Sequence, residues 1–486
     1  MPLTLSPPQL PATLMRAAPP TPVAQATLLA LNRPLAEQLG LDAAALATPA
    51  GVAILAGNAP ATGAAPVALA YAGHQFGSFV PQLGDGRAIL LGEALAADQR
   101  RYDVALKGAG RTPFSRGGDG RAALGPVLRE YVLSEAMAAL GVPTTRSLAA
   151  VLTGESVFRE TVLPGAVLTR VAASHLRIGT FQYFAARQDR QTLEQLTELS
   201  LQRHFPAACR TDGPALALLE GVMAAQARLV AQWMGLGFVH GVMNTDNMAI
   251  SGETLDYGPC AFLDSFDPAR TFSAIDHGGR YAYGNQPQIA QWNVVRLAEC
   301  LLPLVDADAD RATELLLAKL TGFNGLFEAA YAEVFRRKLG LMDSRAGDPE
   351  LVRALLAILA NDRVDFTNFF RSLAESASAD GPEPLDRWFA DPGLWHGWWQ
   401  HWQARRAGEH SPRAAQAEAM RCANPAFIAR NHRVEEMIAA ATAGDMRPFE
   451  RLNQVLSRPY EDQPEAADLA APPGGEQWLY RTFCGT

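Results

Sequence analysis

The fold is decided by the stretch His240-Gly241-Val242-Met243-Asn244-Thr245-Asp246-Asn247-Met248-Ala249-Ile250, followed by Ser251-Gly252-Glu253 and Thr254-Leu255-Asp256-Tyr257-Gly258. It predicts a loop, a strand, a tight turn and a second strand, because Met248 and Ile250 alternate around Ala249 and Ser-Gly-Glu has turn chemistry. This hairpin would hold Asn247 at its start and Asp256 at its end. An amide oxygen and a carboxylate are hard ligands, and such a pair with phosphate oxygens is typical of a magnesium site.

The order of these parts resembles protein kinases and antibiotic phosphotransferases, in which a catalytic loop ends in asparagine and a hairpin leads to Asp-aromatic-Gly. Asp256-Tyr257-Gly258 is similar to their metal-binding triplet. Where the small-molecule kinases have His-Gly-Asp, this chain has His240-Gly241-Val242. Valine cannot accept a proton, so the base is expected elsewhere, and Asp246 is the nearest carboxylate that could replace it.

Composition limits the class of protein. With 486 residues, 48% of them hydrophobic, the chain can bury a large core and is expected to form two or more lobes. A net charge of -8 without a block of basic residues argues against nucleic acid as a general partner. We expect no targeting segment and no apolar stretch long enough to cross a bilayer, hence a cytoplasmic protein without a membrane partner, most simply a monomer.

A glycine-dense segment from Tyr71 to Arg87 precedes a strand expected at 88–93. Its Gly84-Asp85-Gly86 turn would let backbone amides approach a phosphate closely. Hairpins use the same dipeptides, so this segment taken alone does not distinguish a phosphate loop from an ordinary turn.

The next predicted strand supports the interpretation of a phosphate-binding site. Its sequence is Tyr102-Asp103-Val104-Ala105-Leu106-Lys107. Val-Ala-Leu-Lys nearly reproduces the kinase strand whose lysine holds the nucleotide phosphates. An amphipathic helix is expected after Gly125-Pro126 and is stopped by Gly141. Glu130 in its first turns is the preferred partner of Lys107, and Glu135 is the alternative.

Between this strand and helix lies a glycine-rich loop with three arginines, residues 108–121. Asp119-Gly120 could contact a ribose or base there, and the arginines could contact phosphates. The alternative is a flexible surface loop without a ligand.

Together these motifs resemble the selenoprotein O (SelO) family, kinase-fold proteins that transfer AMP instead of phosphate. The resemblance covers nearly the whole chain. It rests on Gly73-His74-Gln75-Phe76-Gly77, Gln82-Leu83-Gly84-Asp85-Gly86-Arg87, the run from Lys107 to Arg116, His240 to Asn247, Asp256-Tyr257-Gly258-Pro259 and Gly279-Arg280-Tyr281-Ala282-Tyr283.

The resemblance implies that ATP binds reversed relative to ordinary kinases, with its α-phosphate toward an acceptor hydroxyl. Asn247 and Asp256 would then hold Mg²⁺ or Mn²⁺, and Asp246 would accept the proton. The acceptors implied are Ser, Thr or Tyr hydroxyls of proteins, with UTP as a possible second donor. The implied nucleotide-binding residues are Gly84, Gly86, Arg87, Lys107, Asp119, Gly120, Arg170, Arg177 and Asp256.

Two cysteines have positions that the resemblance makes significant. Cys260 follows the Asp-Tyr-Gly triplet, and Cys484 lies almost at the C-terminus. Bacterial members of the family resemble a design in which these positions form a reversible disulfide that tunes activity. The alternative is two unrelated thiols.

The expected fold class is α+β, a protein-kinase-like two-lobed fold with a β-rich N-lobe, a C-type helix and a large helical C-lobe. The expected divisions are an N-terminal helical extension (1–70, with a helical patch at 24–39), the N-lobe (71–150), the C-lobe (151–420) and a C-terminal extension (421–486). In the C-lobe, helices are expected at 214–234 and from 287 onward, and Trp395, Trp398, Trp399 and Trp402 are expected to pack between helices.

Two other functions stay open at this point. A conventional kinase is disfavoured by Val242 and by the basic loop after Lys107. An ATP-binding pseudokinase scaffold is disfavoured because Lys107, Asn247 and Asp256 are all retained.

Overall fold

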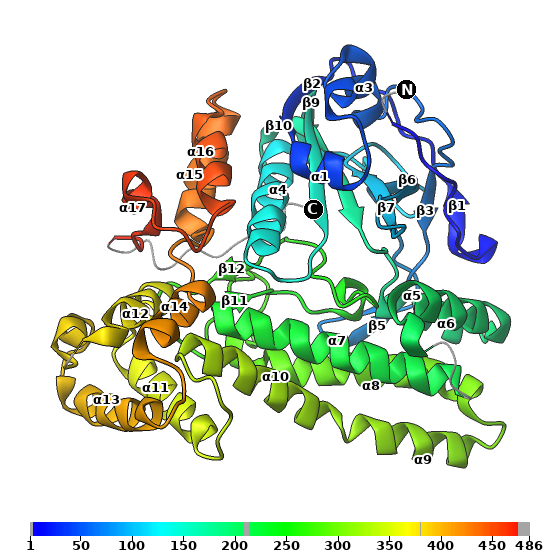
Figure 1. The fold of residues 1–486 in the computed structure, drawn as a ribbon. Coiled ribbons are helices and arrows are strands. Elements are labelled where there is room, and N and C mark those ends of the chain that lie inside the picture. Colours follow the sequence, from blue (N-terminus) through cyan, green and yellow to red (C-terminus); the bar gives the residue numbers. More distant parts are fainter. Residues whose placement is uncertain (1–2, 209–212, 380, 475–486) are drawn as a thin grey trace.

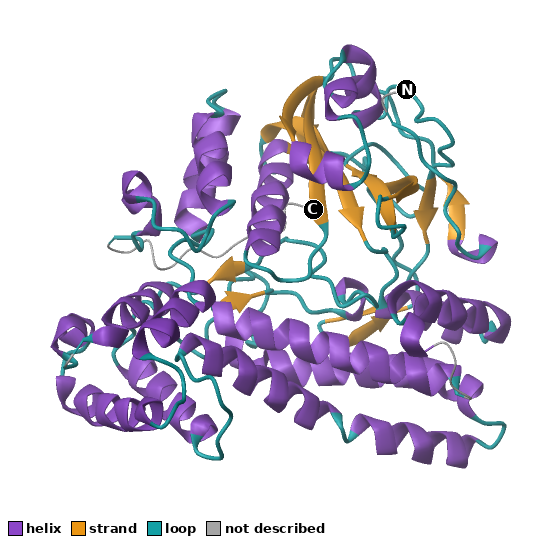
Figure 2. Cartoon of the chain, in the orientation of Figure 1, coloured by secondary structure: helices purple, strands orange, loops and turns teal. Residues whose placement is uncertain are grey.

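The structure is a computed structural model that describes residues 3–208, 213–379 and 381–474. A β-rich N-terminal part lies above a larger helical part, with α4 (Leu124–Ala139) beside the sheet (Figures 1 and 2). The fold is therefore mixed α and β, as predicted.

The N-terminal part is built on one antiparallel sheet in the order β1-β3-β6-β7-β10-β9-β2, with β8 paired to β10. The two predicted strands are confirmed as β6 and β7, which are neighbours in this sheet. Its strands are β1 Met15–Ala17, β2 Thr27–Leu31, β3 Val67–Leu69, β6 Ala88–Leu95, β7 Arg101–Lys107, β8 Ala122–Ala123, β9 Arg146–Phe158 and β10 Val162–Ala172.

The helical patch predicted at 24–39 is wrong in its first half. Residues Thr27–Leu31 form β2 and pair with β9, and only α1 (Arg33–Gln38) is helical. Pairing with a long neighbouring strand outweighs the weak helix preference of an Ala- and Leu-rich segment. The first 70 residues thus supply three strands to the sheet in addition to α1, α2 (Ala43–Leu46) and α3 (Pro49–Leu55).

The boundary expected at residue 150 falls within β9. This strand pairs with β10 from Arg146 to Phe158, so the sheet is continuous to Ala172. The helical part begins with α5 (Ile178–Ala185) and α6 (Arg190–His204). A separate two-stranded hairpin, β4 (Gly73–Gln75) and β5 (Ser78–Val80), lies outside the main sheet.

Two long helices form the centre of the helical part, as predicted. They are α7 (Pro214–Leu236) and α8 (Gln286–Val305), and in α8 the side chains of Val294, Leu297 and Leu301 are fully buried. Leu304 is only partly buried. By length and composition α7 could cross a membrane, contrary to the expectation that no segment would, but 67% of its apolar window is buried as in a core helix.

Of the helices that follow in this part, α9 and α10 pack against α7 and α8, and α11 to α14 pack against α10 or against one another. The four tryptophans of α13 are buried and pack ring against ring, with Trp395 and Trp398 stacked at 5.4 Å, which confirms the predicted packing role. These helices are α9 Ala309–Leu320, α10 Phe323–Lys338, α11 Asp348–Asn361, α12 Phe366–Glu375, α13 Pro392–Ala407 and α14 Arg413–Ala423. A two-stranded sheet joins β11 (Phe238–Val239) to β12 (Ala261–Phe262). Short 3₁₀ turns are η1 Ala12–Leu14, η2 Pro206–Ala208, η3 Thr245–Asn247, η4 Tyr283–Asn285, η5 Ser376–Ser378, η6 Glu383–Trp388 and η7 Pro464–Ala466.

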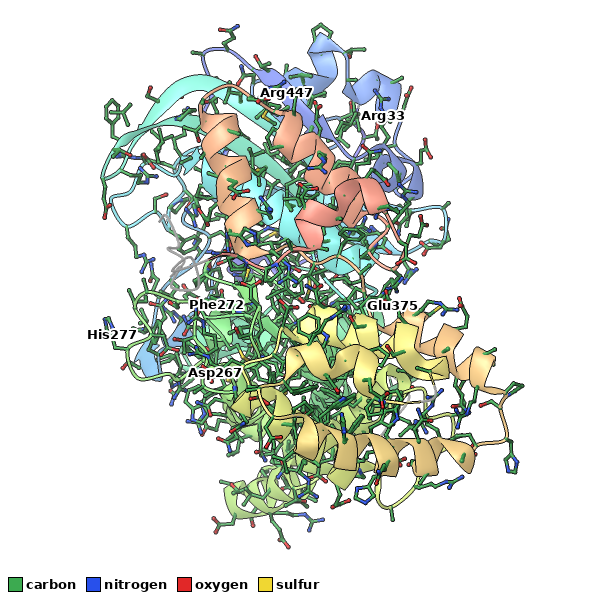
Figure 3. All side chains as sticks on the ribbon, turned by 90° about the vertical axis from the view of Figure 1, so that its left-hand side faces the viewer. Arg33, Asp267, Phe272, His277, Glu375 and Arg447 are labelled. Carbon is green, nitrogen blue, oxygen red and sulfur yellow. The ribbon has the colours of Figure 1, made fainter. Side chains whose placement is uncertain are left out.

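The last helices return to the N-terminal part. They are α15 (Asn431–Thr442), α16 (Arg447–Leu456) and α17 (Ala467–Ala470). Figure 3 shows Arg447 of α16 high beside the sheet, well above Glu375 of the helical part. Here α15 and α16 pack against α4, and Tyr131 meets Phe449 with ring centroids 5.5 Å apart.

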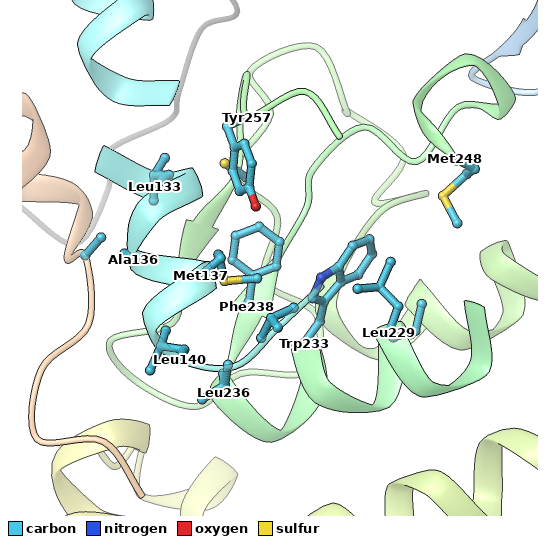
Figure 4. Close-up of a cluster of buried hydrophobic side chains, with 14 of the residues drawn as sticks. Leu133, Ala136, Met137, Leu140, Leu229, Trp233, Leu236, Phe238, Met248 and Tyr257 are labelled. Atoms are coloured by element: carbon cyan, nitrogen blue, oxygen red, sulfur yellow. The ribbon is translucent and has the colours of Figure 1, made fainter. Parts of the chain in front are cut away.

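Helix α4 also joins the two parts through one hydrophobic core. Leu133, Met137 and Leu140 recur at helical spacing in this predicted amphipathic helix, and all three are buried. Figure 4 shows them beside Trp233 of α7 and Phe238 of β11. Because this core is continuous, α4 is held against both parts of the molecule at once.

Candidate active site

A cavity of about 570 Å³ lies where the sheet, the glycine-rich loops and the catalytic loop meet. Its size suits a nucleotide, since ligand cavities commonly span about 300–1,000 Å³. Eleven of the residues predicted from the sequence line it, namely Gly84, Gly86, Arg87, Lys107, Asp119, Gly120, Arg170, Arg177, Asp246, Asn247 and Asp256.

Lys107 of β7 is held between two carboxylates. Its Nζ lies 2.5 Å from Glu130 Oε2 and 2.7 Å from Asp256 Oδ1. Arg170 of β10 lies 2.8 Å from the other Glu130 oxygen. Glu130 is thus the residue that pairs with Lys107, whereas Glu135 pairs with Arg146 at 2.7 Å.

These charges control the pKa values of the two carboxylates. Burial opposes ionisation of Glu130, yet Arg170 and Lys107 outweigh it and lower the pKa. At Asp256 the same burial is outweighed by Lys107 and Arg170, which hold the pKa of that carboxyl well below its usual range. Both groups are therefore anionic at neutral pH.

Asn247 and Asp256 approach the cavity from a tighter loop than predicted. Instead of two strands, one isolated bridge joins Met248 to Thr254, and Asp256 has a left-handed φ of 68°. A non-glycine residue in this conformation is uncommon, and such strain concentrates at functional sites. The Asn247 amide donates to the Val242 carbonyl at 3.0 Å, so its oxygen is left for another partner.

The donor set of Asn247 and Asp256 fits a hard divalent ion, because both supply oxygen and Asp256 is ionised. The Asp256 side chain is 29% exposed, and Lys107 takes its Oδ1 only. Across residues 3–208, 213–379 and 381–474, no group of three or more His, Cys, Asp or Glu side chains is placed to hold a metal. A metal at this pair would thus need further oxygens from phosphates or water.

Asp246 lies in η3, only 7% exposed. Burial raises the pKa of Asp246 to about 6, with Arg177 acting in the opposite direction. Its Oδ1 has no hydrogen-bond partner among the described residues. The Arg177 guanidinium donates to the Asp246 main-chain oxygen at 3.1 Å and lies 3.6 Å from Asp85. A largely ionised carboxylate with an uncommitted oxygen can accept a proton at neutral pH.

The loop at 108–121 is fastened to the glycine-rich turn, which excludes the alternative of a free surface loop. Thr112 Oγ1 donates to the Asp85 carbonyl at 2.6 Å, and Ser115 Oγ donates to the Gly86 carbonyl. The Phe114 ring occupies the space that a side chain at Gly84 would need. The two loops form one wall of the cavity.

Asp119 is engaged by an arginine that the sequence did not point to. Arg159, at the turn between β9 and β10, donates to both Asp119 carboxylate oxygens, at 2.9 and 3.0 Å. These hydrogen bonds lower the pKa of Asp119. Gly120 has φ 67°, and a Cβ there would collide with the Gly110 carbonyl, so only glycine fits.

Three further residues of the cavity were not assigned a role from the sequence. Tyr71 lies under the Arg177 guanidinium, 4.2 Å from ring centroid to Cζ, and Asp85 faces the same arginine. Both residues lie within the glycine-rich segment from Tyr71 to Arg87, so the sequence already indicated their place near the site. No sequence motif indicated Arg159, because only the pairing of β9 with β10 brings its turn to the cavity.

Behind the cavity, Arg129 of α4 joins three segments. Its guanidinium donates to the carbonyls of Gly258 and Cys260, at 3.1 and 2.5 Å, and to Asn431 of α15 at 2.8 Å. It also pairs with Glu435 at 3.0 Å. The C-terminal helices are therefore connected to the segment that follows Asp256.

The structure describes only one of the two cysteines predicted to pair. Cys260 is fully buried. Cys484 lies outside the described residues, so the pairing stays a prediction.

Comparison with known proteins gives a consistent result. Residues 8–457 match the family model described as "Protein adenylyltransferase SelO". A relative from Methylorubrum populi named "Protein nucleotidyltransferase YdiU" is 57% identical over 486 residues, covering 98% of each chain. Relatives of the same name from Bradyrhizobium sp. (strain ORS 278) and Rhizobium meliloti are each 55% identical, covering 98% of this chain and 97% and 98% of their own.

Proposed function

The chain belongs to the SelO family and is a protein nucleotidyltransferase, and we propose that it transfers AMP from ATP to Ser, Thr or Tyr hydroxyls of proteins. The observation that carries the proposal is that one cavity holds both a cluster of cationic side chains and the buried Asp246. The Oδ1 atom of Asp246 has no hydrogen-bond partner among the described residues. Val242 at the position of the usual kinase base supports a base at Asp246 instead.

In this reaction the acceptor hydroxyl oxygen attacks the α-phosphorus of ATP. A new oxygen–phosphorus bond forms, the bond to the bridging oxygen breaks, and pyrophosphate leaves. Asp246 takes the hydroxyl proton, which its pKa of about 6 permits at pH 7. Positively charged side chains that line the cavity stabilise the negative charge of the departing pyrophosphate. These side chains are Arg87, Lys107, Arg170 and Arg177.

Asn247 and Asp256 are the residues proposed to hold Mg²⁺ or Mn²⁺. When bound there, the ion would supply Lewis-acid stabilisation and orientation of the phosphate oxygens. Lys107 and Arg170 keep Asp256 ionised, and the Asn247 amide is oriented by its hydrogen bond to the Val242 carbonyl. These contacts support the assignment of both residues.

We also propose the finer fold assignment, a protein-kinase-like arrangement in two lobes. Support comes from the Lys107–Glu130 pair between β7 and α4 and from the Asn247 and Asp256 loops beneath the sheet. The division between lobes then follows β10, after Ala172, instead of residue 150. The C-terminal extension begins within the segment that leads to α15.

The remaining parts of the proposal concern conditions and control. UTP would serve as a second donor, the protein would act as a monomer in the cytoplasm, and a reversible disulfide between Cys260 and Cys484 would tune activity. The Arg129 bridge to the Cys260 carbonyl supports a link between this position and the site. Mass spectrometry of non-reduced peptides tests the disulfide, which would be excluded if oxidised samples never contained the linked pair.

The function is tested by intact-mass analysis of the protein and of lysate proteins after incubation with ATP and Mg²⁺ or Mn²⁺. A mass increase of one AMP is expected for the wild type and none for Asp256→Ala. Asp445→Ala is the matched control, because Asp445 lies outside the cavity and, among the described residues, forms its ion pair with Arg447. A phosphate-sized increase would identify a conventional kinase, and no increase at all would leave an ATP-binding scaffold.

A further inference from the structure

The hairpin of β4 and β5 lies against the catalytic loop and outside the nucleotide cavity. Its two-residue turn is Phe76-Gly77, with φ of 51° and 86°, the positive values typical of a tight hairpin turn. The His74 amide donates to Thr245 Oγ1 at 2.7 Å, and the Phe76 amide donates to Asn244 Oδ1 at 3.0 Å. The catalytic loop therefore determines where this hairpin lies.

The hairpin comes directly beside the proposed base. A Cβ at Gly73 would stand 2.5 Å from Asp246 Oδ1, so only glycine lets the strand lie this close. From the other side, the Tyr281 hydroxyl donates to Asn244 Oδ1 at 2.5 Å, and the Tyr281 ring meets the Phe76 ring at 5.1 Å. The segment around Tyr281 and the hairpin thus meet next to Asp246.

Two arginines flank one tryptophan at this place, and they differ in their partners. Arg280 and Arg296 lie 4.8 and 4.9 Å from the Trp292 ring centroid. Arg296 is paired with Glu299 at 2.7 Å. Arg280 forms no ion pair within the described ranges, although the buried Nε of both arginines has no hydrogen-bond partner there. An arginine that lies against an aromatic ring and has no carboxylate partner can bind a carboxylate of another molecule.

Aromatic side chains extend this surface outward. The His74 ring contacts Phe79 at 5.0 Å and Trp292 at 5.2 Å, and Phe79 is 41% exposed. We name His74, Phe79, Arg280 and Trp292 the acceptor surface. In a chain with a net charge of -8, a cation here favours an anionic partner against the overall repulsion.

We propose that the acceptor surface binds an extended acidic segment of the protein substrate, whose carboxylate pairs with Arg280 while a nearby hydroxyl reaches Asp246. The inference rests on the proposed function and adds to it a preference for acidic sequences around the modified hydroxyl. Phe79 and Trp292 provide apolar contacts for the aliphatic parts of the bound segment.

The test uses random copolymers of defined charge as acceptors, poly(Glu,Tyr) and poly(Lys,Tyr), with radiolabelled ATP and Mg²⁺ or Mn²⁺. We expect the full-length wild type to modify poly(Glu,Tyr) with kcat/KM at least about tenfold above poly(Lys,Tyr), the range of one charge-assisted hydrogen bond. Arg280→Gln should raise KM for poly(Glu,Tyr) about tenfold and largely remove the preference. Arg280→Lys should restore part of it.

Arg296→Gln is the matched control, because Arg296 lies on the same ring but is already paired. It should keep the preference, and unfolding temperatures of all three variants show whether they remain folded. Equal use of both copolymers by the wild type, or equal KM changes in Arg280→Gln and Arg296→Gln, would overturn the proposal. So would modification of lysate proteins without any modification of poly(Glu,Tyr). If no acceptor of any kind receives AMP, the proposed function itself fails.

Discussion

Two clusters of buried charge lie near opposite ends of β7, around Asp103 and around Lys107, and they differ in how completely their charges are paired. In the cluster at the start of β7, Arg203 of α6 lies 2.9 Å from Glu93 and 2.7 Å from Asp103. Arg101 takes the other Glu93 oxygen, and His175 takes the other Asp103 oxygen. All four carboxylate oxygens have partners, and both carboxylates are at most 1% exposed.

The cluster in the cavity is incompletely paired by comparison. Asp256 keeps an oxygen beyond its contact with Lys107 and is 29% exposed. Asp246 has a carboxylate oxygen without a hydrogen bond among the described residues. Buried polar groups are normally satisfied, so an unsatisfied group at a cavity indicates that a ligand completes it. The paired cluster should therefore serve stability and the incomplete one activity.

The largest expected effect is on activity, from Asp256→Asn in the cavity. Replacing the carboxylate with an isosteric amide removes a proposed metal ligand and should lower kcat/KM on the order of a thousandfold. Unfolding by urea should change less than for a variant of the paired cluster, because Lys107 keeps its ion pair with Glu130. If activity survived while stability collapsed, the distinction between the two clusters would fail.

Next is Arg203→Met in the paired cluster, which should act on stability instead. Removing one partner leaves Glu93 and Asp103 buried with too little positive charge, a loss of about 3–5 kcal/mol. Urea unfolding measures this loss, and Arg203→Lys should recover part of it. We expect kcat/KM of the folded protein to stay within about threefold, because Arg203 does not line the cavity. A hundredfold loss of activity at unchanged stability would reverse the assignment.

Asp246→Asn should lower kcat about a hundredfold, the contribution expected of a positioned base. Because only the ionised carboxylate accepts a proton, wild-type activity should rise with pH through about 6, the pKa to which burial raises this group. The variant should lack this rise. A pH profile that is the same in both proteins would exclude Asp246 as the base.

The smallest effect concerns Glu253, near the paired cluster. Burial raises the pKa of Glu253 to about 7, above its value in the unfolded chain, so the folded state retains a proton that the unfolded state has released. Stability should therefore fall as pH rises, by about 2 kcal/mol between pH 5 and 7. Glu253→Gln should lose this component, which paired urea titrations at both pH values would reveal as a difference between the proteins. Parallel curves for the two would contradict it.

Local sequence was sufficient where neighbouring residues carry the signal. Lys107 was recognisable from the Val-Ala-Leu-Lys sequence of its strand, and Glu130 from its place in the first turns of a helix. Helices α7 and α8 were predictable from apolar spacing, since a buried stripe repeats every three or four residues. The loop at 108–121 was recognisable by composition, although its fastening to the Gly84–Gly86 turn was not.

The features that the sequence analysis predicted wrongly or did not predict depend on residues that are distant in the sequence. Residues 27–31 were assigned to a helix because their pairing with β9 depends on a strand more than 100 residues away. Arg159 stands on a turn with no motif of its own. Arg129 could not be distinguished from an ordinary helix charge, since Asn431 and Glu435 are about 300 residues further along the chain.

By itself the sequence determined the family, the kinds of groups in the site and the order in which they occur, because motifs and periodicity are local properties. Tertiary structure alone decided which charges are fully paired and which are left for a ligand. Pairing and burial depend on residues brought together from distant segments, as Arg203 is to Asp103 and Lys107 to Asp256. The pKa of Asp246 is raised by burial that no stretch of sequence specifies.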